Sequence, residues 1–148
     1  MRLYTRTAAA ISLPLTMIVS LATGAVHATE ALIYKNPQCG CCENYADYLR
    51  ANDYEVTVKP THELSAISRD RGLSDEYQGC HLALIDGYFV SGHVPVTVID
   101  KLLSERPDID GITLPGMPLG SPGMGGNKSE PWKIFAIDDG NSTLFSTQ

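Results

Sequence analysis

The sequence predicts an α/β domain in which helices cover a mixed sheet. Short apolar segments rich in strand-forming residues alternate with segments whose apolar residues recur at i, i+3, i+4 and i+7, the spacing of one helix face. Asp86-Gly87 joins two of the apolar segments as a two-residue hairpin turn, which makes those two strands antiparallel. The length of 148 residues, without an internal repeat, indicates one domain.

The predicted elements come in the order strand, helix, strand, helix, strand, strand and helix. They span residues 31–34, 42–52, 54–58, 62–71, 82–85, 88–90 and 98–103. A long Gly/Pro-rich loop with two methionines follows, at residues 114–126. The last predicted strand is 133–137, and Asp139-Gly140 turns it into a short closing hairpin.

A Cys-x-x-Cys segment, Cys39 to Cys42, lies between the first strand and the first helix. A mixed sheet with this motif at that position is the layout of the thioredoxin fold. Val94-Pro95 comes after a core strand and before a helix, as the cis-proline of that fold does, so we expect a conformationally special X-Pro bond there. The prediction is therefore a thioredoxin-like three-layer domain with a long Gly/Pro/Met loop before the C-terminal strand.

The first 28 residues have the order of a secretory signal peptide. Two arginines give a basic start, a mostly apolar run follows, and small residues end at Ala28. A transmembrane anchor fits less well, because Pro14 and hydroxyl residues interrupt a run that is already short for a bilayer span. We therefore expect residues 1–28 to be removed and residues 29–148 to form the exported domain.

The exported domain is acidic. Two of the eleven basic residues and none of the seventeen acidic ones lie in the predicted signal peptide, which leaves a formal net charge of −8. An acidic domain without a basic stripe is a poor nucleic-acid binder. The charge also gives no reason to expect binding to an anionic membrane after signal cleavage.

All four cysteines lie in the exported part. An oxidising compartment usually turns an even number of cysteines into disulfides. Two structural bridges are nevertheless a poor explanation, because three of the four cysteines stand within four positions and close almost no chain between them. Cys41 and Cys42 are adjacent, and a bridge between neighbours is strained.

The segment Cys39-Gly40-Cys41-Cys42 stands where the first helix begins. Helix N-terminal N–H groups and the helix dipole favour anions, so thiols there lose protons more easily. A thiolate is both the nucleophile of disulfide exchange and a ligand for soft metal ions such as Cu(I). A redox pair needs only Cys39 and Cys42, and a third thiol between them would compete in the exchange. Cys41 therefore favours metal binding over redox chemistry.

Cys80-His81 and His93 are further candidate ligands. Cys80-His81 lies just before a core strand, from which this fold can bring a thiolate and an imidazole to the cysteine segment. His93 precedes the expected proline position, which faces the Cys-x-x-Cys segment, so it is a candidate ligand or proton partner. The alternative is ordinary: a buried cysteine that packs as a small hydrophobe, a surface His81 and a hydrogen-bonded structural His93.

Met117 and Met124 are the only methionines outside the predicted signal peptide, and they share one Pro/Gly loop. Thioether sulfur is a copper ligand, although either side chain could simply cover the underside of the loop. Structural zinc is the second metal to consider, because Cys39/Cys42 and Cys80/His81 imitate the separated pairs of zinc sites. Zinc would leave Cys41 and both methionines unexplained, so copper ranks above zinc.

Five stretches that span most of the exported chain carry a family resemblance. They are Tyr34-Lys35-Asn36-Pro37-Gln38-Cys39-Gly40-Cys41-Cys42, Cys80-His81, Asp86-Gly87-Tyr88, Gly92-His93-Val94-Pro95 and Pro115-Gly116-Met117-Pro118-Leu119-Gly120-Ser121-Pro122-Gly123-Met124. In these stretches the chain resembles the CopG family, small exported copper-resistance proteins encoded with bacterial copper-efflux systems. Members usually carry Thr after the Cys-His pair. The residue here is Leu82, which we expect to change the polarity beside the site without removing a ligand.

The resemblance implies a periplasmic thioredoxin-like domain that binds copper through cysteines. We expect Cys39, Cys41 and Cys42 to be the core ligands and Cys80 to complete them, with four outer or exchange ligands, His81, His93, Met117 and Met124. The expected ion is Cu(I), and imidazole would help to hold Cu(II) if copper cycles. Its expected task is sequestration, transfer or redox buffering, with components of a copper-efflux system as partners.

A rival interpretation is an enzyme. In a thiol–disulfide oxidoreductase Cys39 would attack and Cys42 would resolve the mixed disulfide. The sequence favours a metal-binding protein over this enzyme, since the enzyme has no use for Cys41.

Overall fold

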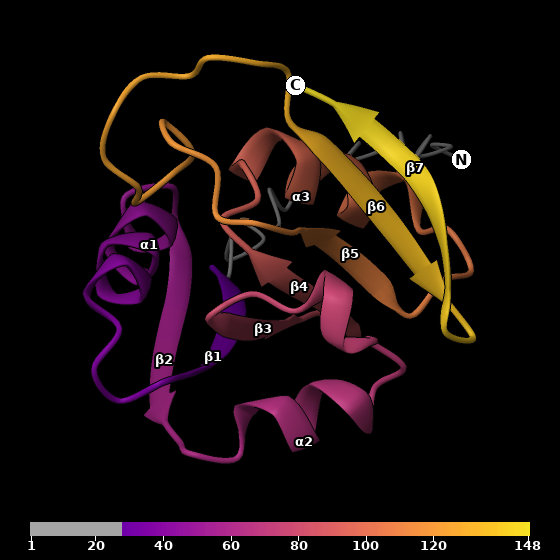
Figure 1. Ribbon diagram of the computed structural model, residues 1–148, viewed down its shortest axis with the longest axis horizontal. Coiled ribbons are helices and arrows are strands. Elements are labelled where there is room, and N and C mark those ends of the chain that lie inside the picture. The colour runs from indigo at the N-terminus through magenta and orange to yellow at the C-terminus, as the bar shows by residue number, and fades with distance from the viewer. Residues whose placement is uncertain (1–27) are drawn as a thin grey trace, which may run out of the picture.

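A mixed sheet of seven strands runs through the part of the chain that the computed structural model describes, residues 28–148 (Figure 1). The strands lie in the order β2-β1-β3-β4-β5-β6-β7. Their bounds are β1 Thr29–Lys35, β2 Tyr54–Pro60, β3 His81–Ile85, β4 Tyr88–Gly92, β5 Gly111–Leu114, β6 Lys133–Asp138 and β7 Asn141–Thr147. The helices are α1 Gly40–Arg50, α2 Leu64–Arg69 and α3 Val96–Glu105, with a short 3-10 turn, η1, at Asp75–Tyr77. The predicted signal peptide lies outside the described residues except for Ala28.

The first four strands form the mixed sheet that the sequence predicted, including the antiparallel hairpin at Asp86-Gly87. β1 and β2 are parallel and are joined by α1, while β3 is antiparallel to both of its neighbours, β1 and β4. Asp86 and Gly87 form the turn between β3 and β4 with φ values of 47° and 92°. These values fit a type I′ hairpin turn, which requires positive φ at both central positions, and glycine and aspartate adopt such φ values more readily than most residues. The α/β class with a mixed sheet is therefore confirmed.

Helices cover both faces of the sheet, and two hydrophobic cores show which helix lies on which face. Side chains alternate along β3, so Ala83 and Ile85 enter the larger core and Leu82 enters the smaller one. The larger core also contains the buried faces of α1 and α3. The smaller core contains Leu64 of α2. The predicted three-layer arrangement is present, with α1 and α3 on one face and α2 on the other.

Strand β5 was missed by the sequence prediction, which began a loop at Leu114. Its apolar run is only a few residues long and is followed by Pro115, so periodicity cannot distinguish it from a loop. Long-range pairing makes it a strand: β5 is parallel to β4 and antiparallel to β6, and all its residues are buried.

Two further expectations need correction. The second helix, predicted over 62–71, spans only Leu64–Arg69. It begins later than predicted because Thr61 Oγ1 accepts a hydrogen bond from Glu63 N at 3.0 Å and forms a turn in front of it. The bond before Pro95 is trans, and no cis peptide bond occurs among the described residues. Pro95 instead caps the start of α3, where its missing N–H leaves no helix hydrogen bond unmade.

The chain from β5 to β6 is a long loop that reaches back over α1, drawn in orange in Figure 1. After β6, the turn at Asp139 and Gly140 leads into β7, so the predicted closing hairpin is confirmed. Within residues 28–148, no helix has both the length and the apolar character needed to span a bilayer.

Candidate metal centre

The cysteine segment is shaped by a tight connection between β1 and α1. Asn36 O accepts a hydrogen bond from Cys39 N at 3.1 Å, so the chain turns as soon as the strand ends, and Pro37 lies in this turn. Cys39 is the N-cap residue of α1, and its side chain makes no capping hydrogen bond. The first N–H groups of α1 therefore keep their attraction for anions, which favours thiolates at this helix start.

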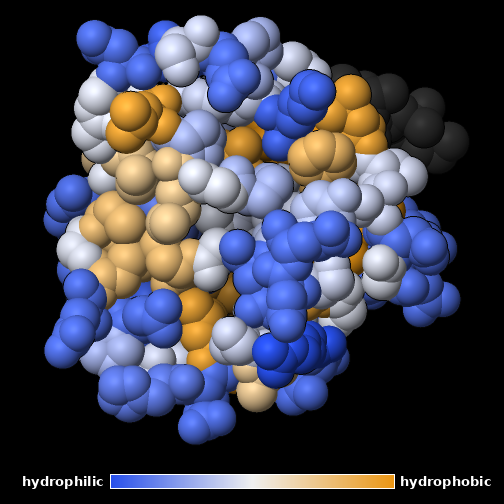
Figure 2. All heavy atoms as spheres, in the orientation of Figure 1, coloured by the Kyte–Doolittle hydropathy of each residue, from blue (hydrophilic) through white to orange (hydrophobic). Residues whose placement is uncertain are grey.

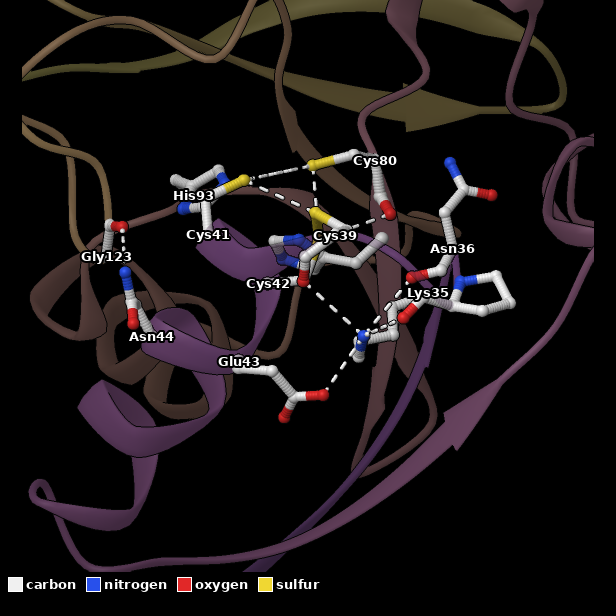
Figure 3. Close-up of a disulfide and its surroundings, with 12 residues drawn as sticks. Lys35, Asn36, Cys39, Cys41, Cys42, Glu43, Asn44, Cys80, His93 and Gly123 are labelled. Carbon is white, nitrogen blue, oxygen red and sulfur yellow. Dashed lines mark hydrogen bonds and ion pairs between the residues drawn. A yellow bond between two sulfur atoms is a disulfide. The ribbon is translucent and has the colours of Figure 1, made fainter.

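Sulfur atoms from two distant segments meet at the start of α1 (Figure 3). The antiparallel register of β1 and β3 pairs Lys35 with His81, which places Cys80 beside the cysteine segment. Cys80 Sγ lies 3.2 Å from Cys42 Sγ and 3.8 Å from Cys41 Sγ. The Sγ atoms of Cys39 and Cys41 are 3.3 Å apart, and all four sulfurs lie within 4.8 Å of one another. The structure thus brings together the four cysteines predicted as ligands.

Cys39 and Cys42 are joined by a disulfide, while Cys41 and Cys80 are free. Each sulfur of the disulfide has a free thiol beside it, Cys41 next to Cys39 and Cys80 next to Cys42. The arrangement can therefore exchange disulfides or present four thiolates to a metal ion. These two states exclude each other, because a sulfur in a disulfide is not available as a thiolate ligand.

The thiol of Cys80 resists ionisation in the metal-free protein. Burial, together with the neighbouring Cys41, raises the pKa of Cys80 to about 12. The positive charge of Lys35 acts in the opposite direction. A metal ion would supply the positive charge that four adjacent thiolates lack, which is how metal binding drives thiol deprotonation.

His93 presents a lone pair to the sulfur cluster. Its Nδ1 lies 2.6 Å from Pro122 O, and a carbonyl oxygen can only accept, so Nδ1 carries the proton. The lone pair is then on Nε2, which lies 3.9 Å from Cys80 Sγ. Burial lowers the pKa of His93 and keeps the imidazole neutral, the form that binds metal ions.

His81 is fully buried and neither of its ring nitrogens has a hydrogen-bond partner. Burial, together with the nearby His93, lowers the pKa of His81 to about 3, so the ring is neutral. Unpartnered buried nitrogens are rare because each costs about 1–3 kcal/mol. One nitrogen of His81 lies within 4.8 Å of both Cys80 Sγ and a nitrogen of His93. A metal ion beside Cys80 would give His81 the partner it lacks.

Tyr45 is a site residue that the sequence analysis did not identify. It is fully buried on α1, and its ring centroid lies 4.5 Å from that of His81 and 5.3 Å from that of His93. Its hydroxyl donates a hydrogen bond to Val94 O at 2.8 Å, which ties α1 to the segment that carries His93. The available signal was its spacing, because Tyr45 is three residues after Cys42 and therefore on the same helix face.

The Pro/Gly/Met loop is held against α1 at Gly123. Asn44 Nδ2 donates a hydrogen bond to Gly123 O at 3.3 Å, and a Cβ on Gly123 would lie only 2.7 Å from Tyr45 N. Met124 follows directly and is partly buried, whereas Met117 is 40 % exposed. The structure thus brings Met124 toward the cysteine-bearing helix and leaves Met117 at the surface. In the space-filling view, hydrophobic side chains gather on the left, over α1 and this loop (Figure 2).

The structure places Lys35 and Leu82 differently from what the sequence suggests. Lys35 is buried beneath the cysteine segment, although a lysine next to a loop is normally solvated, so the sequence carried no signal for it. Leu82 does not lie beside the site as expected, because strand alternation turns its side chain into the smaller core, away from the face that carries Tyr45.

The fold and the site define an α/β domain with a sulfur-rich centre of the kind that holds soft metal ions. Two solved structures titled copper resistance protein CopG, form 2 and form 1, are each 34 % identical to the chain. The first match covers 81 % of this chain and 98 % of the other, with a TM-score of 0.75, and the second covers 80 % and 96 %, with a TM-score of 0.74. The chain belongs to the CopG family.

A family model described as a protein of unknown function, DUF411, matches residues 77–124. This segment contains the candidate ligands outside the cysteine segment, which are Cys80, His81, His93, Met117 and Met124. None of the curated proteins compared with the chain matches it.

Proposed function

We propose that this chain is a periplasmic copper-binding protein of copper resistance that holds Cu(I) for sequestration, transfer or redox buffering. The observation that carries the proposal is the meeting of four cysteine sulfurs within 4.8 Å of one another, from segments almost forty residues apart. Soft thiolate ligands favour Cu(I) and zinc over hard cations, and a donor set that also contains thioether sulfur favours copper over zinc. Membership of a family whose solved members are titled copper resistance proteins supports copper as the ion.

Cys39, Cys41, Cys42 and Cys80 are the proposed thiolate ligands. His81 and His93 are the proposed imidazole ligands, because one has unpartnered ring nitrogens and the other directs its free Nε2 toward Cys80. Met124 is the proposed thioether ligand, and Met117, at the surface, would exchange copper with its surroundings. Imidazole ligands would also help to hold Cu(II) if the bound copper cycles between its two oxidation states.

More than one Cu(I) can share this donor set, since sulfurs as close as 3.2 Å can each bridge two ions. Metal analysis of the reduced protein tests this, with more than one copper per chain as the expected result. A maximum of one copper per chain would contradict a multi-copper cluster while leaving copper binding intact.

The deciding experiment is a titration of reduced residues 29–148 with Cu(I), with the bound metal counted per chain and zinc offered in competition. The oxidised protein is the matched control, because its disulfide removes two of the four thiolates. We expect the reduced form to bind copper in preference to zinc and the oxidised form to lose most of its affinity. Preferred binding of zinc by the reduced form would overturn the proposal.

Thiol–disulfide oxidoreductase activity is the second candidate, and the Cys39–Cys42 disulfide is the observation that favours it. Cys41→Ser separates the two functions. An oxidoreductase would keep its exchange activity, because Cys39 and Cys42 remain. A copper-thiolate site would lose copper affinity or stoichiometry. Cys41 Sγ lies 3.3 Å from Cys39 Sγ, where it would compete with any substrate thiol, so copper binding ranks first.

Export to the periplasm is part of the proposal. Mass spectrometry of the protein purified from the periplasm should find a chain that begins at Thr29. Exchange of copper with components of a copper-efflux system is the proposed partnership, which co-purification in copper-fed cells would test.

A further inference from the structure

Lys35 is a charged residue inside the protein. It is the last residue of β1, and its side chain is only 2 % exposed beneath residues 36–39, the cysteine loop (Figure 3). Within residues 28–148 it is the only lysine or arginine that is buried. Burying an ammonium group costs several kcal/mol unless acceptors surround it, so its position calls for an explanation.

The acceptors of Lys35 come mostly from the cysteine loop. Its Nζ donates to Asn36 O at 3.2 Å, Pro37 O at 3.3 Å and Cys39 O at 3.4 Å. Asn36 O also accepts from Cys39 N, so the loop backbone closes around the ammonium. The hydrogen bonds of the Lys35 ammonium to these carbonyls therefore stabilise the loop conformation that places the cysteine sulfurs together.

Glu43 forms an ion pair with Lys35 but neutralises it only in part. Its Oε1 lies 3.0 Å from Lys35 Nζ, yet the Glu43 side chain is 55 % exposed. Water and salt screen the exposed carboxylate, whereas the buried ammonium acts through a medium of low dielectric constant. The positive charge is therefore felt on the side of the thiols, including Cys80.

We propose that Lys35 is a positioning residue of the metal site. It gathers the carbonyls of the cysteine loop so that Cys39, Cys41 and Cys42 converge, and its fixed charge favours the reduced thiolate state over the disulfide. The metal-binding part of this inference rests on the proposed copper function. The charge effect applies equally to the metal-free protein, and so can be tested without copper.

Lys35→Met removes the charge and keeps a long unbranched side chain. The metal-free variant is equilibrated with glutathione buffers, in which two glutathione thiols reduce the Cys39–Cys42 disulfide and become oxidised glutathione. We expect the equilibrium constant for this reduction to fall at least tenfold, which lowers the reduction potential by about 30 mV. In a second assay, competition with a Cu(I) chelator, we expect the copper affinity to fall between about tenfold and about a hundredfold.

Two variants serve as controls. Lys59→Met makes the same change of charge at an exposed position of β2 and should move neither the potential nor the affinity. Glu43→Gln keeps Lys35 and its three carbonyl partners but removes the countercharge, so it should make the disulfide easier to reduce. Shifts of the reduction potential in opposite directions in Lys35→Met and Glu43→Gln would identify a charge effect.

A folded Lys35→Met protein with the wild-type potential and affinity would overturn the inference. Loss of stability alone, with an unchanged potential, would also overturn it, because it would limit Lys35 to a structural role. If Lys35→Met does not fold, Glu43→Gln decides, and an unchanged potential refutes the charge effect. A wild-type protein that binds no Cu(I) would refute the proposed function, while the potentials would still test Lys35.

Discussion

Gly123 is the point at which the Pro/Gly/Met loop touches the helix that carries the cysteines, so Gly123→Ala tests whether this contact secures the site. The added Cβ would lie 2.7 Å from Tyr45 N and 3.0 Å from Asn44 C. Both atoms belong to the backbone of α1, so no side chain can rotate away to make room. Gly123 also has a φ of 78°, a conformation that residues with a Cβ rarely adopt.

Two terms set the expected loss of stability. The left-handed backbone conformation costs alanine about 1–2 kcal/mol. The forced contact with α1 adds about 1–3 kcal/mol, as overpacking usually does. Gly116→Ala is the matched control, because Gly116 has a φ of 79° but no atom within 4 Å of an added Cβ. The difference between the two variants therefore isolates the contact with α1.

Urea unfolding of the reduced protein is the assay. With a slope of about 1–3 kcal/mol per molar urea, Gly123→Ala should unfold at a midpoint about 1 M below that of Gly116→Ala. Its copper affinity should fall as well, since displacing the loop takes Pro122 O away from His93 Nδ1. Equal midpoints for the two variants would refute the reasoning, because the loop would then not be held against α1.

Three further predictions concern the buried rings. His81→Phe should leave the free energy of unfolding of the metal-free protein unchanged or higher, because it removes two unpartnered nitrogens. The copper affinity of the variant should fall. A clear loss of stability in urea would contradict the first expectation. The pKa of His81 is lowered from 6.5 to about 3, so the unfolded chain takes up the proton first as the pH falls. The contribution of His81 to the free energy of unfolding of the metal-free protein should therefore fall by up to about 1.4 kcal/mol per pH unit from pH 6.5 toward pH 3. The Tm of His81→Phe should fall less steeply over this range than that of the wild-type protein. Tyr45→Phe should lower the free energy of unfolding by about 1–3 kcal/mol, because it leaves the buried Val94 O without its donor, and wild-type stability in urea would show that this carbonyl finds another partner.

The elements of this fold that the sequence predicted correctly are those that local patterns describe. Apolar spacing located α1 and α3, and Asp86-Gly87 located the hairpin of β3 and β4. Where local patterns were too short, prediction failed, as for β5, whose strand conformation depends on pairing with β4 and β6. The extent of the second helix was also overestimated, because propensity alone does not show that Thr61 closes a turn before it.

The candidate ligands were identified from the sequence because their chemistry belongs to the side chains themselves, and three of the cysteines are neighbours in the chain. Their meeting with Cys80 depends on the register of β1 and β3, since a shift of one residue would turn the neighbouring side chains to the other face. The same register placed Leu82 in the opposite core, contrary to the sequence-based expectation.

Only the tertiary structure decided three properties of the site. Pro122, almost thirty residues after His93, fixes which nitrogen of that imidazole carries the proton. The contact at Gly123 holds the neighbouring Met124 near α1, whereas Met117 stays at the surface, so the two methionines are suited to different roles. Lys35 lies in the core because the cysteine loop closes around its ammonium. The physical reason is common to all three: sequence patterns report contacts between near neighbours, whereas burial and hydrogen-bond partners arise from segments that meet only in the folded chain.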